Sequence, residues 1–549
     1  MKILIVGGVA GGATAAARLR RLNESAEIII FEKSPYVSFA NCGLPYYIGG
    51  EIGEKSDLTL QTPESFKARF NIDVRVNSEV ISLSPLEKKV TVKNLENGSI
   101  YDESYDKLIL SPGAFPILPN IDGIESKGVF TLRNIPDTER IKNYIEENSP
   151  RSALIVGGGY IGLEMAENLS RLGLSVTVAD ISDHLVPSLD FDMAADLHRY
   201  AREKGVSLIL KSGVSKIEER AGSLAVTVGM TTLVVDMVII SVGVAPDSSL
   251  ASKAGLTVNS KGYIVVDRHM QTSDLDIYAV GDAIQVRNFI TKEFFTAPLA
   301  GPANKEGRIA ADNICGIKSE YQGTQGSAIL KFFDMTVASC GLNESAATKA
   351  DIDFDKTYTY SASHATYYPG ASMMSVKLLW DKRTLKILGA QIVGFDGVDK
   401  RMDVISTAIR LGARVTELSA LELCYAPPFG SAKDPVNMVG FVAENVISGK
   451  MRQFFWHDVS SLPRDGSVTL LDTRTVREVE RGRIDGFINI PLDSLRENLD
   501  KIPKDKPVYV HCHSGLRSYI ACRILEGYGY KTYNLAGGFR LYNSVISEL

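Results

Sequence analysis

One pattern occurs twice in this chain of 549 residues: an apolar strand, a glycine-rich turn, a helix, a second strand and then an acidic residue. The first copy runs from Lys2 to Glu32 and the second from Ala153 to Asp180. Each copy has the length of a βαβ unit that binds a dinucleotide, because free N–H groups at the helix start attract a pyrophosphate. The acid accepts hydrogen bonds from ribose hydroxyls. The repeat therefore predicts an α/β protein with two dinucleotide-binding domains.

The glycine spacing differs between the two copies. The second copy has the complete G-x-G-x-x-G pattern, whereas Val9 replaces the middle glycine of the first. Glycine lets the backbone approach the pyrophosphate without a Cβ clash. Such turns also occur as plain strand–helix connections, but here strand, helix and acid accompany both. The candidate cofactor-binding residues are Gly7, Gly11, Gly12 and Glu32 in the first copy, and Gly157, Gly159, Tyr160, Gly162 and Asp180 in the second.

The composition is that of an ordinary globular protein. Hydrophobic residues make up 45%, charged residues 23%, and the net charge is −5, which excludes wholesale disorder and a disulfide-dense scaffold. No basic block indicates a nucleic-acid partner, and no apolar run approaches the roughly 18–20 residues of a membrane span. Six scattered cysteines without an export signal favour a reducing cytoplasm. We therefore expect a cytoplasmic protein that acts on a small molecule.

A third motif, Gly281-Asp282, follows an apolar strand and suits contact with the ribityl chain of a flavin. With the two repeats, it resembles the two-dinucleotide flavoprotein disulfide reductases over residues 1–449. The resemblance implies FAD in the first unit, NADH or NADPH in an inserted second unit, and a C-terminal domain that forms a homodimer interface. Asp180 favours NADH without excluding NADPH, because a ribose 2′-phosphate would meet a like charge.

Cys42 is the candidate redox thiol. Most reductases of this group carry a Cys-x4-Cys pair here, but Tyr47 stands where the second cysteine would be. A single thiol cannot form an internal disulfide, so it forms a mixed disulfide with the substrate, a persulfide or a sulfenic acid. A helix N-terminus and a neighbouring flavin would stabilise its thiolate.

The segment around Cys42, Ser-Phe-x-x-Cys-Gly-x-Pro-Tyr-Tyr, closely resembles coenzyme A disulfide reductases. Two later motifs, Tyr367–Pro369 and Tyr425–Phe429, match the same family. The resemblance implies that Tyr367 and Tyr425 reach the active site of the partner subunit, where a phenol can donate a proton to a leaving thiolate. Interface packing is the alternative role for both.

Coenzyme A carries an anionic 3′-phospho-ADP group, which requires cationic or polar contacts. Arg18 and Arg21 are three residues apart and share a face of the first predicted helix. That face either binds the phosphates or is simply solvated. The resemblance adds Ser38, Asn41 and Lys433 at positions that contact coenzyme A, as a substrate or a tightly bound cofactor.

A second candidate thiol, Cys512, ends an apolar strand and opens the loop Cys512–Arg517, after which a helix begins. Loop N–H groups and the helix dipole would form an anion site that lowers the pKa of the thiol and holds a persulfide or thiosulfonate. Arg517 adds positive charge. His511 and His513 flank the cysteine, but without a second ligand cluster we expect no metal site.

The Cys-x4-Arg loop resembles that of rhodanese domains, which carry sulfane sulfur as a cysteine persulfide. Further matches lie in Leu471–Arg474, Gly482–Pro491 and Gly537-Gly538, so the resemblance covers about residues 455–549. It implies a sulfurtransferase domain, with Cys512 as its sulfur carrier and Arg517 beside it. The other cysteines are expected to be buried filler.

The complete chain resembles fusions of coenzyme A disulfide reductase with rhodanese. The resemblance implies reduction of coenzyme A disulfide, coenzyme A persulfide or polysulfide. The alternative is an NADH oxidase or peroxidase with a cysteine sulfenate and a C-terminal sensor or docking module. Such oxidases typically carry a histidine at the position of Ala10, whereas the first histidine here is His184.

The expected architecture is therefore α/β, with two nested Rossmann-like domains, an α+β dimerisation domain and a C-terminal α/β rhodanese domain. The expected boundaries are 1–112 and 245–324 for the FAD domain, 113–244 for the NAD(P)H domain, 325–449 for the dimerisation domain, 450–462 for a linker and 463–549 for the rhodanese domain.

Overall fold

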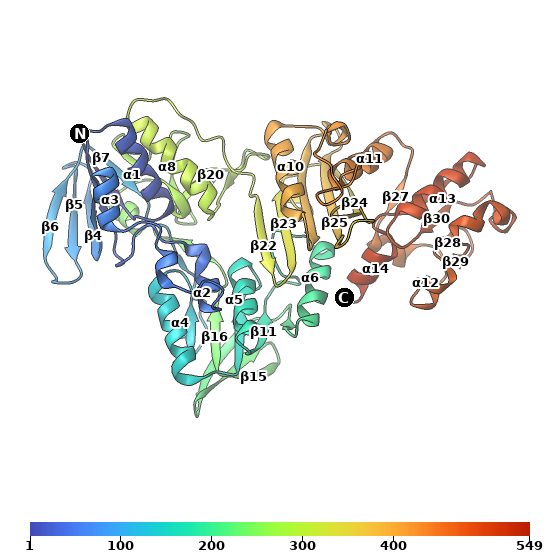
Figure 1. Ribbon diagram of the computed structural model, residues 1–549, viewed down its shortest axis with the longest axis horizontal. Coiled ribbons are helices and arrows are strands. Elements are labelled where there is room, and N and C mark those ends of the chain that lie inside the picture. Colours follow the sequence, from blue (N-terminus) through green and yellow to red (C-terminus); the bar gives the residue numbers. More distant parts are fainter. The chain divides into compact units, whose positions relative to one another are not determined.

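The computed structural model describes residues 1–549, which form two compact units (Figure 1). The first unit contains residues 1–181 and 206–324, and the second contains residues 182–205 and 325–549. Both predicted nucleotide-binding repeats lie in the first unit. None of the helices combines the length and the apolar character that crossing a lipid bilayer requires.

The first repeat forms the centre of a five-stranded parallel sheet. Its strands, in spatial order, are β19 (Ile277–Ala279), β7 (Lys107–Leu110), β1 (Lys2–Val6), β2 (Glu27–Phe31) and β3 (Asp73–Arg75). The apolar side chains of β1 are buried, because helices cover a parallel sheet on its faces. Helix α1 (Ala10–Leu22) packs against α8 (Ala300–Ile314). Residues after 276 thus return to the sheet that the first 110 residues begin.

The second repeat forms another five-stranded parallel sheet. Its strands, in spatial order, are β12 (Ser207–Ile209), β11 (Ser175–Ala179), β10 (Ser152–Val156), β16 (Met237–Ile240) and β9 (Val129–Thr131). Helix α5 (Tyr160–Arg171) follows β10, as the pattern predicts. The short strands β8 (Ala114–Pro116) and β17 (Val244–Pro246) pair with each other. This pairing brings together the two crossings between the domains, which the sequence placed after residues 112 and 244.

Two antiparallel sheets of three strands also belong to the first unit. They consist of β4 (Ser78–Ser84), β5 (Lys89–Asn94) and β6 (Ile100–Ser104), and of β13 (Val214–Arg220), β14 (Ser223–Val228) and β15 (Thr231–Val235). In β5 buried residues alternate with less buried ones, as expected of a strand with one face on a core.

An antiparallel sheet dominates the second unit. Its strands, in spatial order, are β22 (Ala328–Phe332), β23 (Met335–Gly341), β26 (Ile387–Gly394), β25 (Met373–Asp381) and β24 (Phe354–Ala362). Helices α10 (Val398–Leu411) and α11 (Pro435–Ile447) pack on this sheet. The sequence predicted the helix near 400–411, which is α10.

Helix α6 (Phe191–Glu203) packs in the second unit, although its sequence lies inside the predicted NAD(P)H domain. Asp192 and Asp196 are buried in it and accept hydrogen bonds from Tyr358 and Ser375 of the antiparallel sheet. Buried acids need hydrogen-bond partners, and the sheet supplies one to each of them, which helps to hold the helix there.

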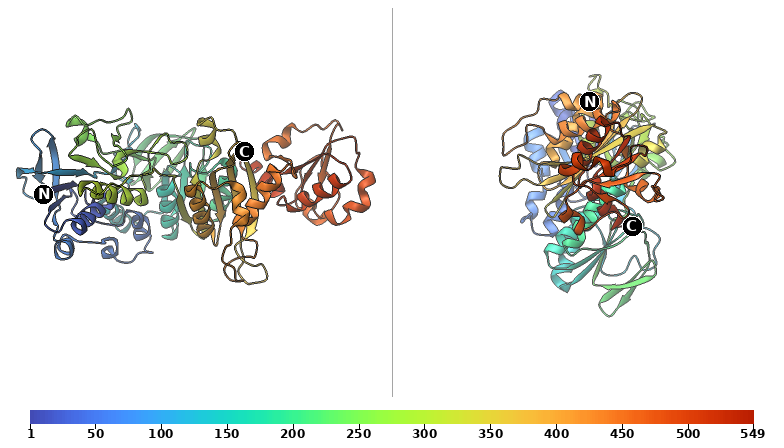
Figure 2. Two further views of the ribbon diagram at one scale, coloured as in Figure 1. Left: turned by 90° about the horizontal axis from the view of Figure 1, so that it is seen from above. Right: turned by 90° about the vertical axis from the view of Figure 1, so that its right-hand side faces the viewer.

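The C-terminal domain, red in Figure 2, has a five-stranded parallel sheet. Its strands, in spatial order, are β27 (Gln453–Phe454), β31 (Thr532–Leu535), β30 (Val508–His511), β28 (Thr469–Asp472) and β29 (Ile488–Asn489). Its helices are α12 (Val476–Glu480), α13 (Leu516–Gly527) and α14 (Gly538–Ile546). The edge strand β27 lies within the expected linker, 450–462. Because Phe454 is buried in the core of this domain, that part of the linker belongs to the C-terminal domain.

Candidate active sites

The two glycine-rich turns have the same geometry. A Cβ at Gly12 would lie 1.9 Å from the Gly7 carbonyl oxygen, and one at Gly162 would lie 2.0 Å from that of Gly157. Both first glycines also have a positive φ, so each turn requires glycine at its first and last positions. Val9 takes the middle position because the backbone there has φ −99°, which any residue adopts.

The helices after both turns begin without a side-chain cap. A Cβ at Gly159 would meet no atom within 4 Å, so space remains in front of α5. Uncapped N–H groups at an open helix start suit a pyrophosphate. The residues of both turns therefore fit the two dinucleotides that the sequence predicts.

The two acids after the second strands hold these turns. Glu32 accepts hydrogen bonds from the N–H groups of Gly8 (2.9 Å) and Ser34 (3.0 Å), and Asp180 accepts one from Gly158 (2.6 Å). Burial raises the pKa of Glu32. Both acids thus lie beside the glycine turns, which is the position expected of an acid that binds the ribose of a dinucleotide.

The Gly281-Asp282 motif forms a short 3₁₀ helix, η3 (Gly281–Ala283), directly after β19. Arg133 Nη2 lies 2.6 Å from the Asp282 carboxylate. Glu306 of α8 is buried and accepts a hydrogen bond from the Gly281 N–H (2.8 Å). Burial raises the pKa of Glu306 to about 8. Sequence reasoning missed both Arg133 and Glu306, because neither belongs to a spaced motif.

Cys42 lies in the 3₁₀ helix η1 (Asn41–Gly43), immediately before α2 (Leu44–Ile48). The preceding Ser38 donates its N–H to the Gly8 carbonyl (2.8 Å), which ties the cysteine segment to the first turn. All six cysteines are free, and the expectation that the other four are buried is wrong for Cys424, which is exposed. The structure therefore places the Cys42 segment next to the first glycine turn, within the first unit.

The protein groups around Cys42 favour the thiol over the thiolate. Cys42 is exposed to solvent. Partial desolvation and the carboxylates of Glu164 and Asp282 raise the pKa of its thiol, and Arg133 only partly offsets them. Burial also raises the pKa of Glu164 to about 7, and Tyr46 donates to its carboxylate at 3.4 Å. The expected stabilisation of the thiolate is therefore not supplied by these side chains.

The expected coenzyme A contacts lie in both units. Arg18 is ion-paired with Asp312 through a 2.7 Å contact of its Nε, whereas Arg21 is exposed. Asn41 donates its side-chain amide to the Arg133 carbonyl at 3.2 Å. Lys433 is exposed in the second unit. Of the two arginines, Arg21 is the one exposed to solvent.

Tyr367 and Tyr425 lie side by side in the second unit. Their hydroxyl oxygens are 2.8 Å apart, and the side chains are 74% and 48% exposed. The hydrogen bond to Tyr425 raises the pKa of Tyr367. Two loops separated by 58 residues thus present one phenol pair to solvent.

The Cys512 loop has the predicted geometry, between β30 and α13. The N–H of Gly515 and the hydroxyl of Ser518 point at Sγ, at 3.1 and 3.2 Å. These donors stabilise negative charge on the sulfur. Cys512 is fully buried in this arrangement.

The charge of Arg517 is paired within the domain. Its two terminal nitrogens donate to both carboxylate oxygens of Glu478 on α12, at 2.6 and 2.8 Å. The backbone and hydroxyl of Thr475 also donate to Glu478, and the pKa of this carboxyl lies well below its usual range, chiefly through Arg517. Glu478 was missed in the sequence because it lies 39 residues from its partner.

The flanking histidine His511 is a packing residue. Its ring lies against Phe487 and Phe539, and its Nε2 lies 3.4 Å from the Asp472 carboxylate. Burial lowers the pKa of His511 to about 4.

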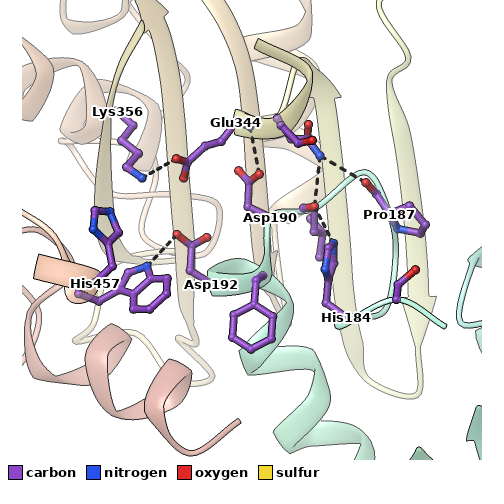
Figure 3. Close-up of a pocket in the computed structure, with 13 residues that line it drawn as sticks. His184, Pro187, Asp190, Asp192, Glu344, Lys356 and His457 are labelled. Carbon is purple, nitrogen blue, oxygen red and sulfur yellow. Dashed lines mark hydrogen bonds and ion pairs between the residues drawn. The ribbon is translucent and has the colours of Figure 1, made fainter. Parts of the chain in front are cut away.

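A separate cavity of about 380 Å³ lies in the second unit, lined partly by α6 and the Trp456 segment (Figure 3). Asp190, Asp192 and Glu344 there hold their oxygens close enough for a metal ion. However, the buried Lys377 ammonium contacts all three carboxylates. The lysine takes the place that a cation would need, so we assign this cluster to packing.

The fold and these sites define a class of protein: an oxidoreductase with two nested dinucleotide domains, a free cysteine beside the first glycine turn and a thiol-bearing C-terminal domain. The chain belongs to the pyridine nucleotide-disulphide oxidoreductase family, which matches residues 1–303. The dimerisation domain of that family matches residues 327–435, and a rhodanese-like domain matches residues 456–544. These matches confirm the expected fold class, and membership implies FAD and NAD(P)H.

Relatives match both parts of the chain. The coenzyme A disulfide reductase of Staphylococcus haemolyticus is 36% identical over 81% of this chain and 100% of its own length. The crystal structure of reduced Bacillus anthracis CoADR-RHD is 49% identical, covers 100% of this chain and 98% of that chain, and has a TM-score of 0.97. A NAD-dependent persulfide reductase from A. fulgidus is 38% identical, covers 99% and 100%, and has a TM-score of 0.93.

The relatives also include an NADH oxidase of Methanocaldococcus jannaschii, 35% identical over 82% of this chain and its complete length. Part of this chain therefore lies outside that match. The structure from A. fulgidus, which covers 99% of this chain, is described as a NAD-dependent persulfide reductase.

Proposed function

We propose that this protein is an NAD(P)H-dependent reductase of coenzyme A disulfide, coenzyme A persulfide or polysulfide, with a sulfurtransferase domain at its C-terminus. The observation that carries the proposal is the lone, free Cys42 tied to the first glycine turn. With no cysteine partner at Tyr47, the second sulfur of any disulfide must come from the substrate.

In the first step, the Cys42 sulfur attacks one sulfur of the substrate. A Cys42–S–S–R bond forms, the substrate S–S bond breaks, and the leaving thiolate takes the electron pair and then a proton. Two electrons and two protons then convert the mixed disulfide into two thiols. Bound FAD supplies those electrons from NAD(P)H.

The chain's own residues hold the reactants. The two open helix starts bind the dinucleotides, with Asp180 favouring NADH. Arg18, Arg21, Ser38, Asn41 and Lys433 contact coenzyme A. In a homodimer, Tyr367 and Tyr425 of one protomer donate a proton to the thiolate that leaves in the other.

In the C-terminal domain, the Cys512 thiolate attacks the sulfane sulfur of polysulfide or thiosulfate. A Cys512 persulfide forms, the donor S–S bond breaks, and the shortened polysulfide or sulfite leaves with the electron pair. The Gly515 N–H and the Ser518 hydroxyl then stabilise the sulfur charge. Coenzyme A passing between the two thiols would connect the two activities.

The test is Cys42→Ser in the flavin-loaded enzyme. We expect NADH-dependent reduction of coenzyme A disulfide and coenzyme A persulfide to fall to background, while NADH still bleaches the flavin absorbance. Turnover equal to that of the wild type would refute the role of Cys42. Comparing NADH and NADPH against each sulfur substrate then identifies the physiological pair.

The oxidase alternative predicts a different result. In that case, aerobic NADH consumption without a sulfur substrate would equal the rate with it. We expect NADH consumption with a sulfur substrate to exceed consumption without it by at least about tenfold, because an enzyme stabilises the transition state of its own substrate most strongly.

A further inference from the structure

The phenol pair depends on two loops rather than on packing of its own rings. Because Tyr367 and Tyr425 are exposed, little contact with the core holds their side chains. Their loops meet through one backbone hydrogen bond, from the Ala365 N–H to the Gly430 carbonyl at 2.9 Å. Whatever fixes these two backbones therefore fixes the distance between the hydroxyls.

Arg401 of α10 is the side chain that joins both loops. It is 2% exposed, and its Nη2 donates at 2.8 Å to the Ser363 carbonyl, at the start of the Tyr367 loop. The same nitrogen and Nε donate to the carboxylate of Asp434, at 2.8 and 3.1 Å. Its Nη1 donates to the Gly397 carbonyl at 3.2 Å. One guanidinium thus contacts three separate backbone segments.

Asp434 carries this connection toward Tyr425 and Lys433. It follows Lys433 directly and caps α11 by accepting the Val436 N–H at 3.0 Å. The Tyr425 loop therefore ends at a carboxylate that Arg401 holds. His364 reinforces the other loop, with its Nε2 at 3.2 Å from the Pro369 carbonyl.

We propose that Arg401 is a positioning residue that sets the spacing of Tyr367 and Tyr425 for proton donation. The inference rests on the proposed function, because it requires that these tyrosines protonate the leaving thiolate. A buried ion pair alone is weak evidence for stability. Here the fork geometry matters, since a lysine at this place could not donate to Ser363, Gly397 and Asp434 together.

The experiment compares Arg401→Lys with Tyr425→Phe and Tyr367→Phe in the flavin-loaded enzyme on two substrates. Coenzyme A disulfide has a basic leaving thiolate that needs a proton. The mixed disulfide of coenzyme A with thionitrobenzoate has an acidic leaving thiol that does not. We expect Arg401→Lys to lower kcat about tenfold on the first substrate and to leave the second within about twofold, with KM for NADH unchanged.

The combined variant Arg401→Lys/Tyr425→Phe provides the decisive comparison. If Arg401 acts through the phenol, the double variant loses no more than about twofold beyond Tyr425→Phe alone, because coupled residues are not additive. Independent, multiplied losses, or equal losses on both substrates, would overturn the inference. No loss in either tyrosine variant would instead overturn the proposed role of the tyrosines.

A matched control lies in the rhodanese domain. Arg474 and Asp472 form a similarly buried pair, each 2% exposed, with Nη2 2.7 Å from the carboxylate. Arg474→Lys should leave reduction of coenzyme A disulfide unchanged.

A second variant is available if Arg401→Lys does not fold. Asp434→Asn weakens the same contact with Arg401 while keeping the shape of the side chain, and we expect the same selective loss on coenzyme A disulfide. A uniform loss there would contradict positioning.

Discussion

At the scale of single residues, several important groups are paired by partners that no motif contains. Glu478 holds Arg517, Arg133 holds Asp282, and Arg401 holds Asp434. Each partner is remote in sequence, so only folding brings it to the motif. The motif alone therefore does not show whether the charge of one of its residues is free or paired.

The first prediction concerns Glu478→Gln. Loss of the carboxylate leaves the Arg517 charge unpaired near the Cys512 loop. We expect KM for the dianion thiosulfate to fall about fivefold in a sulfurtransferase assay with cyanide, and KM for the monoanion benzenethiosulfonate to fall less. Glu480→Gln removes an exposed charge from the same helix and should change neither. Equal changes for both donors would contradict a charge effect.

The second prediction concerns Glu306 and pH. The pKa of Glu306 is raised to about 8 in the folded protein. Between the ordinary pKa of a glutamate and pH 8, the folded protein therefore keeps a proton on Glu306 that the unfolded chain has lost. The contribution to stability is therefore present at low pH and is lost as pH rises through that range. Glu306→Gln, which can still accept from Gly281, should raise the unfolding temperature by several degrees at pH 8–9 and by little at pH 5.

Thermal unfolding of the flavin-loaded variant across this pH range measures the effect. A constant difference between wild type and variant at all pH values would show that Glu306 does not titrate in this window.

At the scale of elements, α6 connects the antiparallel sheet of the second unit to the C-terminal domain. Asp192 accepts from Lys377 and Tyr358 of the antiparallel sheet and lies 3.4 Å from Trp456 Nε1 of the C-terminal domain. Asp196 accepts from Ser544 of α14 at 2.8 Å. One helix of the second unit thus fastens the rhodanese domain to the dimerisation sheet.

The third prediction follows from that contact. Asp192→Ala removes a fully buried carboxylate from Lys377 and should lower the stability of the second unit by about 3 kcal/mol, because it leaves buried donors without a partner. Cleavage by a protease near residues 450–462 should become faster. Asp183 is an exposed acid in the segment that precedes α6. Asp183→Ala should leave both the unfolding temperature and the cleavage rate unchanged.

At the scale of the whole molecule, the two thiols belong to separate domains, and Cys512 has two hydrogen-bond donors within its own domain. The fourth prediction is that Cys512→Ser abolishes persulfide formation by the C-terminal domain and lowers turnover of polysulfide by about tenfold or more. Reduction of coenzyme A disulfide should remain within about twofold of wild type. Mass spectrometry of the persulfide and the two steady-state rates test this. Equal loss of both activities would show that Cys512 has no separate role.

Much of the fold and of the site was predictable, because short-range patterns encode them. The two glycine turns need glycine for local steric reasons, and the strands and helices around them follow hydrophobic periodicity. The lone Cys42 and the Cys512 loop were visible for the same reason. The thiolate expected at Cys42 was not supported by its surroundings, since Glu164 approaches from a domain more than 100 residues away.

By itself, the sequence determined the two dinucleotide turns, the order of the domains and the two candidate thiols, neither of which has a neighbouring cysteine partner. These features depend on residues close together in the chain. Only the tertiary structure decided that α6 packs in the second unit, that Arg401 joins the tyrosine loops and that Glu478 neutralises Arg517. Buried charges must find partners wherever the fold places them, and that choice is made by packing over long sequence distances.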